Sequence, residues 1–202
     1  MQARRWPVAV GLIAGVVAIA LAFHTGVTAA EQFQLAARWT ARASFPLLIL
    51  VYSASSLLRL FPGPATKALV RDRRWWGLAF ALAHAIHLAA LTLYLSYFGE
   101  RPALGTLLGG GLAYVLLLAM AATSTDRAQA AMGRNWKRLH TAGIHWLWFI
   151  FAFSYAGRVL RGDEMPYAAI ALGVALFALQ LRIIAWATAR ARRKRSEDPA
   201  AD

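Results

Sequence analysis

The feature that most constrains this chain is the recurrence of apolar windows about 20 residues long, the length that an α-helix needs to cross a bilayer. Hydrophobic residues make up 59% of the 202 residues and charged residues only 15%, below the roughly 25% charged residues of a soluble domain. The sequence therefore predicts an all-α integral membrane bundle of six transmembrane helices, near 7–28, 44–61, 75–98, 103–122, 136–157 and 166–187.

Lysine and arginine residues divide unequally between the two sides of such a bundle. Fifteen fall on the side of the termini and five on the other side. Basic loops stay in the cytoplasm, so we expect both termini to be cytoplasmic. The fifteen are Arg4, Arg5, Lys67, Arg71, Arg73, Arg74, Arg127, Arg134, Lys137, Arg138, Arg190, Arg192, Arg193, Lys194 and Arg195, and the five are Arg38, Arg42, Arg101, Arg158 and Arg161.

The ends of the chain have their own interpretation. Residues 1–190 are predicted to form one domain, and the charged segment 191–202 a disordered cytoplasmic tail. The basic start, apolar run and "VTAA" of the first span also resemble a cleaved signal peptide, but the run is long for one, so we expect a retained span.

The net charge of +13 lies in short runs between apolar stretches, which argues against nucleic-acid binding.

Four of the five histidines fall on the third and fifth predicted spans, which run parallel. At 1.5 Å per residue from the tryptophans that open the spans, His84 and His87 lie ~14 and ~18 Å in, and His140 and His145 lie ~6 and ~14 Å in. Ionisable groups within a membrane are costly and suggest a function. Imidazoles facing each other across two helices suit axial ligation of a haem iron, and a flat, apolar haem can replace direct contact between the helices.

Two other interpretations of these histidines stay open. They can be hydrogen-bonding groups between helices, or they can bind zinc, although no Asp or Glu lies within the spans to complete such a site. The absence of cysteine excludes disulfides, iron–sulfur clusters and thiolate haem ligation. Two stacked haems need ligands about 13 residues apart along each helix, or about 20 Å. The histidine spacings are shorter, so we expect one haem per chain.

Basic residues stand at the cytoplasmic rim of both spans. Arginine can meet a carboxylate with two parallel hydrogen bonds, so Arg74, Arg134, Lys137 and Arg138, with Arg73, are candidates to contact haem propionates. Each of them taken singly is equally consistent with topology signalling.

Two segments resemble the ferric-reductase-like transmembrane domain family. "RRWWGLAFALAHAIHL" has an Arg-Arg pair before the third span and a histidine, His87, ten residues past Gly77. "TSTDRAQAAMGRNWKRLH" ends in the pattern W-K-x-L-H at His140. Over roughly residues 40–160 the chain looks most like the haem-binding membrane subunits of periplasmic methionine-sulfoxide reductase systems. The matching positions of the second segment are Thr123, Ser124, Asp126, Trp136, Lys137, Leu139 and His140.

The resemblance implies a six-helix domain that binds haem b and moves electrons across the membrane, with His87 and His140 as the inner ligand pair. Many family members have an outer ligand 13 residues further along the fifth span, where this chain has Phe153. His84 and His145 are additions, so either the iron ligands or groups supporting them can come from that pair.

The function that the resemblance implies is that of a b-type haem-binding, multi-pass subunit of the bacterial inner (plasma) membrane, which transfers electrons toward a periplasmic acceptor. A cytoplasmic flavin reductase or a quinol is the expected donor, with a periplasmic oxidoreductase as partner; flavin or quinone would act through partners. One rival is a quinone-coupled cytochrome with a site near Tyr94, Ser96 and Tyr97. Another rival is a haem-free transporter or assembly factor, which would be colourless.

Overall fold

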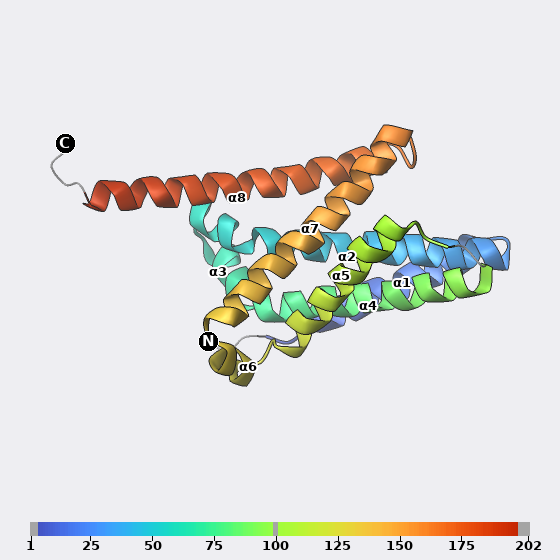
Figure 1. Cartoon of the computed structure of the whole chain (residues 1–202), viewed down its shortest axis with the longest axis horizontal. Helices are drawn as coiled ribbons and strands as arrows, with labels where there is room; N and C mark the ends of the chain where they lie inside the picture. Colours follow the sequence, from blue (N-terminus) through green and yellow to red (C-terminus); the bar gives the residue numbers. More distant parts are fainter. Residues whose placement is uncertain (1–3, 99–100, 198–202) are drawn as a thin grey trace.

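The computed structural model describes residues 4–98 and 101–197, and these residues form helices without any β-strand (Figure 1). The predicted all-α class is therefore confirmed. The helices are α1 (Pro7–Thr25), α2 (Ala29–Leu60), α3 (Pro64–Arg71), α4 (Arg73–Phe98), α5 (Leu104–Ala122), α6 (Asp126–Met132), α7 (Arg134–Arg161) and α8 (Tyr167–Glu197).

Helices α1, α2 and α4 pack along one another as a trio. Small residues on α1 make this contact close. A Cβ atom on Gly11 would lie 2.2 Å from the carbonyl oxygen of Ala79, and one on Gly15 would lie 2.5 Å from a side-chain carbon of Ile86. Small residues four apart let two membrane helices approach until their backbones touch. The rotation of α4 about its axis is thus fixed by α1.

Helix α2 begins 15 residues before the predicted span at 44–61. The Thr28 hydroxyl accepts a hydrogen bond from the Glu31 amide (3.2 Å), and the Glu31 carboxylate accepts one from the Val27 amide (3.0 Å). These two bonds satisfy amides that a helix start leaves free. The added turns contain charged and polar residues, which lower the mean hydropathy of this segment. The same turns bury Ala36 and Thr40 within the trio of α1, α2 and α4.

The short helices α3 and α6 turn the chain at one end of the bundle, which we call the α3/α6 end (left in Figure 1). There Asp72 accepts hydrogen bonds from the Arg4 amide (3.0 Å) and from the Arg71 guanidinium (2.6 and 2.9 Å). The bonds from Arg71 lower the pKa of Asp72 to about 2. The segment before α1 is thereby tied to the corner between α3 and α4.

Helix α7 crosses the bundle obliquely and contacts α5 and α8 (Figure 1). Two indoles on α7 donate across these contacts, Trp146 to the carbonyl of Gly109 (3.1 Å) and Trp148 to the carbonyl of Ala175 (2.9 Å). By contrast, α4 and α7 nowhere bring their Cα atoms within 8 Å in the described part of the chain. Helices in direct contact have axes about 8–10 Å apart, so these two are held apart.

Five of the helices are long and apolar enough to cross a membrane: α1, α2, α4, α5 and residues Tyr167–Arg193 of α8. The remaining predicted span, the fifth (near 136–157), corresponds to α7, whose length is sufficient but whose two histidines and three tryptophans lower its hydropathy. Helix α8 continues to Glu197, into the segment predicted to be a disordered tail, and residues 198–202 lie outside the described residues.

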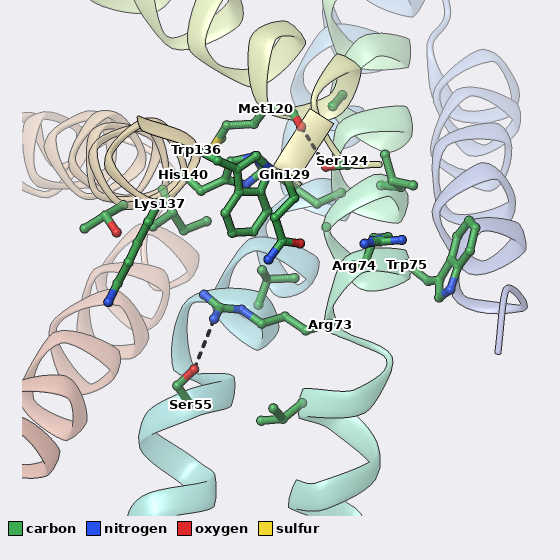
Figure 2. Close-up of a pocket in the computed structure, with 18 of the residues that line it drawn as sticks. Ser55, Arg73, Arg74, Trp75, Met120, Ser124, Gln129, Trp136, Lys137 and His140 are labelled. Atoms are coloured by element: carbon green, nitrogen blue, oxygen red, sulfur yellow. Dashed lines mark hydrogen bonds between the residues drawn. The ribbon is translucent and has the colours of Figure 1, made fainter. Parts of the chain in front are cut away.

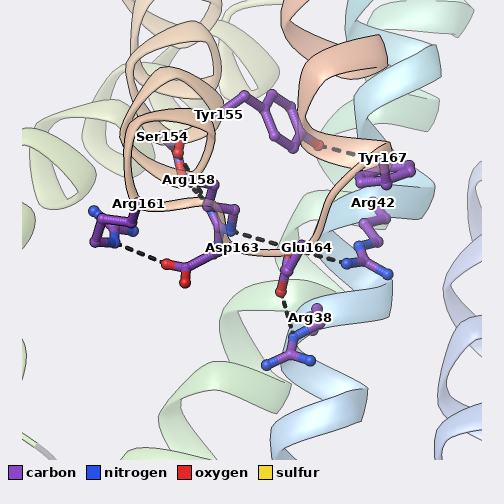
Figure 3. A network of polar contacts seen from close by, with 9 residues as sticks. All are labelled: Arg38, Arg42, Ser154, Tyr155, Arg158, Arg161, Asp163, Glu164 and Tyr167. Carbon is purple, nitrogen blue, oxygen red and sulfur yellow. Dashed lines mark hydrogen bonds and ion pairs between the residues drawn. The ribbon is translucent and has the colours of Figure 1, made fainter.

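At the opposite end of the bundle, three guanidinium groups converge on one carboxylate (Figure 3). Glu164, in the loop after α7, pairs with Arg38 (2.8 Å), Arg42 (2.9 Å) and Arg158 (3.1 Å). Arg42 also lies over the ring of Tyr167, 4.4 Å from its centroid. We call these residues the Glu164 cluster; it joins the first half of α2 to the end of α7 and the start of α8.

Candidate functional site

A cavity of about 1450 Å³ lies at the α3/α6 end, between α2, α4, α5, α7 and α8 (Figure 2). Its walls come from both helices that are held apart, with Gly77, Phe80 and Ala81 on α4 facing Thr141 and Ile144 on α7. The cavity occupies the space that direct packing of α4 on α7 would fill.

His140 lines this cavity from the second turn of α7 (Figure 2). The corner at Gly133, with φ of +50°, ends α6 and lets α7 begin at the next residue, a backbone conformation that favours glycine. The His140 ring stacks on Trp136, with centroids 4.1 Å apart, and its Nε2 atom lies 3.3 Å from the Thr123 hydroxyl. Trp136 donates to the carbonyl of Thr123 (2.9 Å). Thr123 and Trp136, two of the positions that match the resemblance, thus orient the imidazole of a third, His140.

His84 and His87 lie on α4 outside the residues that line the cavity. Both imidazoles face α2, where Nδ1 of His84 is 3.0 Å from the Ser44 hydroxyl and Nδ1 of His87 is 3.3 Å from the Thr40 hydroxyl. Their rings are 5.0 Å apart. His84 follows Phe80, a cavity residue, by one helical turn, and the two rings stack with centroids 5.4 Å apart.

His145 faces a different neighbour. Its Nδ1 atom lies 3.2 Å from the Tyr52 hydroxyl of α2, and the two rings meet edge to face at 5.4 Å. The four predicted histidines are therefore divided among three places. Within residues 4–98 and 101–197, no group of three or more His, Asp and Glu side chains could hold a metal ion, although a haem iron needs only two protein ligands.

The predicted cationic residues are also divided. Arg134 and Lys137 line the cavity, and so does Arg74, which pairs with the exposed carboxylate of Asp126. That contact and the charge of Arg74 lower the pKa of Asp126. Arg138 is exposed and is not among the cavity residues.

Two further cavity residues, both arginines, make contacts that the sequence did not predict. Arg73 reaches into the cavity and donates to the Ser55 hydroxyl (3.1 Å, Figure 2). Arg182 of α8 also lines the cavity, donating to the carbonyl of Tyr52 (3.0 Å) with its guanidinium 4.7 Å from the Tyr52 ring centroid. A lone arginine in an apolar segment was the signal available for Arg182.

The residues that line the cavity have the chemistry that a haem requires. One wall offers an imidazole, the rim offers guanidinium and ammonium groups, and Phe80, Leu117 and Ile144 provide apolar surface. The imidazoles of α4 lie one and two turns beyond Phe80, further from the α3/α6 end than His140.

Curated proteins similar to this chain have been named for a haem-binding role. The protein-methionine-sulfoxide reductase haem-binding subunit MsrQ of Klebsiella pneumoniae is 29% identical over 167 residues, covering 75% of this chain and 77% of its own length. MsrQ of Salmonella paratyphi B and of Salmonella newport are each 29% identical over 176 residues, covering 80% of this chain and 82% of their own. The resemblance drawn from the sequence is confirmed. No family model and no solved structure matches the chain.

Proposed function

We propose that this protein is a b-type haem-binding subunit of a bacterial membrane electron-transfer system. The observation that carries the proposal is the cavity between α4 and α7, with His140 in its wall, in a chain whose relatives are named MsrQ haem-binding subunits. A bound haem would supply one-electron redox chemistry, and the protein would supply ligands, a medium of low dielectric and contacts to the propionates.

His140 is the proposed axial ligand from α7, because it is the only one of the four predicted histidines among the described cavity residues. The proposed ligand from α4 is His87 or His84. The hydroxyls of Thr40 and Ser44 hold the Nδ1 atoms of these imidazoles, which leaves Nε2 as the atom that would bind iron. Such partners fix the orientation of a ligating imidazole.

Arg134 and Lys137 are proposed to bind the propionates, since both line the cavity on the side of His140. Arg74 is held by Asp126 at the same rim, and the exposed Arg138 lies one residue after Lys137 on α7. We expect one haem per chain, because Phe153 stands at the position of an outer ligand in the related domains and is exposed.

The proposed donor is a cytoplasmic flavin reductase or a quinol, and the proposed acceptor is a periplasmic oxidoreductase. The names of the relatives, which are subunits of a methionine-sulfoxide reductase, support an oxidoreductase partner. The chain itself is then one component of a redox system rather than a self-sufficient enzyme.

We also propose that α7 crosses the inner membrane as the fifth of six spans, with both termini in the cytoplasm. The chain has no cysteine, so single cysteines can report sidedness. In intact cells, Lys67→Cys between α2 and α4 should resist a membrane-impermeant maleimide, and Asp163→Cys after α7 should react. Reaction of both or protection of both would contradict the three crossings, by α4, α5 and α7, that the proposal places between them.

The visible spectrum of the purified protein, oxidised and reduced, tests the haem proposal. Protein produced with ample haem should show a low-spin Soret band that shifts on reduction, and pyridine haemochrome analysis should give about one haem per chain. A colourless preparation would favour the haem-free transporter or assembly factor, and two haems per chain would overturn the single-site arrangement.

A further inference from the structure

The cavity holds more positive charge than its acidic neighbours balance. Seven of its residues are cationic, of which Arg71 pairs with Asp72 and Arg74 with Asp126. The other five make no ion pair within the part of the chain that the structure describes, and they are Arg59, Arg73, Arg134, Lys137 and Arg182.

Two of these five, Arg73 and Arg182, are held at the cavity by bonds to α2. Arg73 of α4 donates to Ser55, and Arg182 of α8 donates to the carbonyl of Tyr52. Tyr52 and Ser55 are three residues apart on α2, so they lie on one face of that helix. The charges of the two guanidinium groups act on each other. Like charges repel, so holding two arginines here without a carboxylate costs free energy that a bound anion would offset.

A bound haem would not neutralise all of this positive charge. Its two propionates would neutralise two of the five cations, and Arg134 and Lys137 already stand on the side of His140. Arg59, Arg73 and Arg182 then remain. Arginine binds phosphate with two parallel hydrogen bonds, and basic pockets between membrane helices on the cytoplasmic side suit phospholipid head groups.

We propose that Arg73 and Arg182 form a binding site for a phosphate ester, the head group of an anionic phospholipid. The residues that line the cavity also include Trp75 and Trp186, the latter 58% exposed. Tryptophan is enriched at the level of the head groups, which places the site where a phospholipid can enter from the side. Arg59, which is exposed and also lines the cavity, stands close enough on α2 to attract the anion.

Thermal unfolding in a nonionic detergent tests this site. Short-chain phosphatidylglycerol should raise the melting temperature, and phosphatidylcholine with the same acyl chains should raise it far less. Arg73→Gln and Arg182→Gln should each weaken the apparent affinity for phosphatidylglycerol about tenfold, the effect of losing one charge-assisted hydrogen bond. Arg192→Gln removes an exposed cation from the same helix outside the cavity and should leave the affinity within about twofold.

Inorganic phosphate is the third ligand to compare in the thermal-unfolding experiment. If it protects as well as phosphatidylglycerol at equal concentration and depends on the same arginines, the phosphate site stands and its source is a soluble phosphate ester. Equal protection by both lipids, or an equal loss in Arg192→Gln, would overturn the proposal. If a Gln variant does not fold, Arg73→Lys and Arg182→Lys keep the charge but lose the paired hydrogen bonds, and should weaken binding about threefold.

Arg182 allows the two proposals to be tested apart, because it bonds to the carbonyl of Tyr52 and is not a proposed haem contact. Loss of protection in Arg182→Gln with an unchanged Soret band would separate the two proposals, whereas colourless protein that phosphatidylglycerol still protects would leave the phosphate site standing alone.

Discussion

The two ends of the bundle use arginine in opposite ways. In the Glu164 cluster, Arg38, Arg42 and Arg158 surround one carboxylate whose side chain is only 16% exposed. At the α3/α6 end, Arg73 and Arg182 face a cavity and bond to a hydroxyl and a carbonyl. Charges that a chain balances itself can hold helices together, whereas charges left unbalanced around a cavity indicate a ligand. The difference supports the proposal that the α3/α6 end, and not the Glu164 cluster, binds a ligand.

Removing the imidazole of the cavity should have the largest effect. His140→Ala is expected to abolish the low-spin Soret band, because it deletes the proposed ligand from α7. The matched control is His24→Ala, which removes an exposed imidazole near the C-terminal end of α1. This variant should keep the full haem spectrum. A wild-type haem content in His140→Ala would exclude His140 as a ligand.

The two histidines of α4 should differ from each other. One of His87→Ala and His84→Ala should lose the low-spin spectrum, and the other should lower haem content less, since only one imidazole can bind the iron from α4. Electron paramagnetic resonance of the ferric protein distinguishes loss of an axial ligand from partial occupancy. Two variants with unchanged spectra would remove α4 from the site.

A substitution in the Glu164 cluster should lower the stability of the protein and leave its haem spectrum unchanged. Glu164→Gln leaves three guanidinium groups without their carboxylate and should cost about 2 kcal/mol, measured as a lower melting temperature with an unchanged haem spectrum. Asp163→Asn is the matched control, because its partner Arg161 is 64% exposed, and an exposed pair contributes little. Equal losses in both variants would show that the cluster is not the stabilising element.

The smallest expected effect is a dependence of stability on pH. Burial raises the pKa of Glu164, but the hydrogen bond from Arg42 and the charges of Arg42, Arg158 and Arg38 outweigh it, so the net pKa is lowered below 4.5. A lowered folded-state pKa gives stability that is present above the unfolded value and is lost as the pH falls through the folded value. Melting temperatures should therefore fall in acid more steeply for the native chain than for Glu164→Gln; parallel curves would contradict the assignment.

The apolar windows predicted the long helices because crossing a membrane demands both length and low polarity. The start of α2 was missed because Glu31 and the arginines that follow mask a helical segment that is stable by packing. The cavity itself could not be predicted, since the spacing of His84 and His87 says how far along α4 they lie but not toward which helix they point. The packing of α1 on α4 decides that they face Thr40 and Ser44.

The close contact of Gly11 with Ala79 makes the two sides of the cavity unequal in stiffness. Helix α4 is locked against α1 by backbone contact, so it cannot withdraw without separating the trio. Helix α7 meets its neighbours through side chains: the indoles of Trp146 and Trp148, Met120 against Gly143, and Arg158 in the Glu164 cluster. If the proposed haem binds between α4 and α7, the adjustment that admits it therefore falls on α7 and α5 rather than on α4.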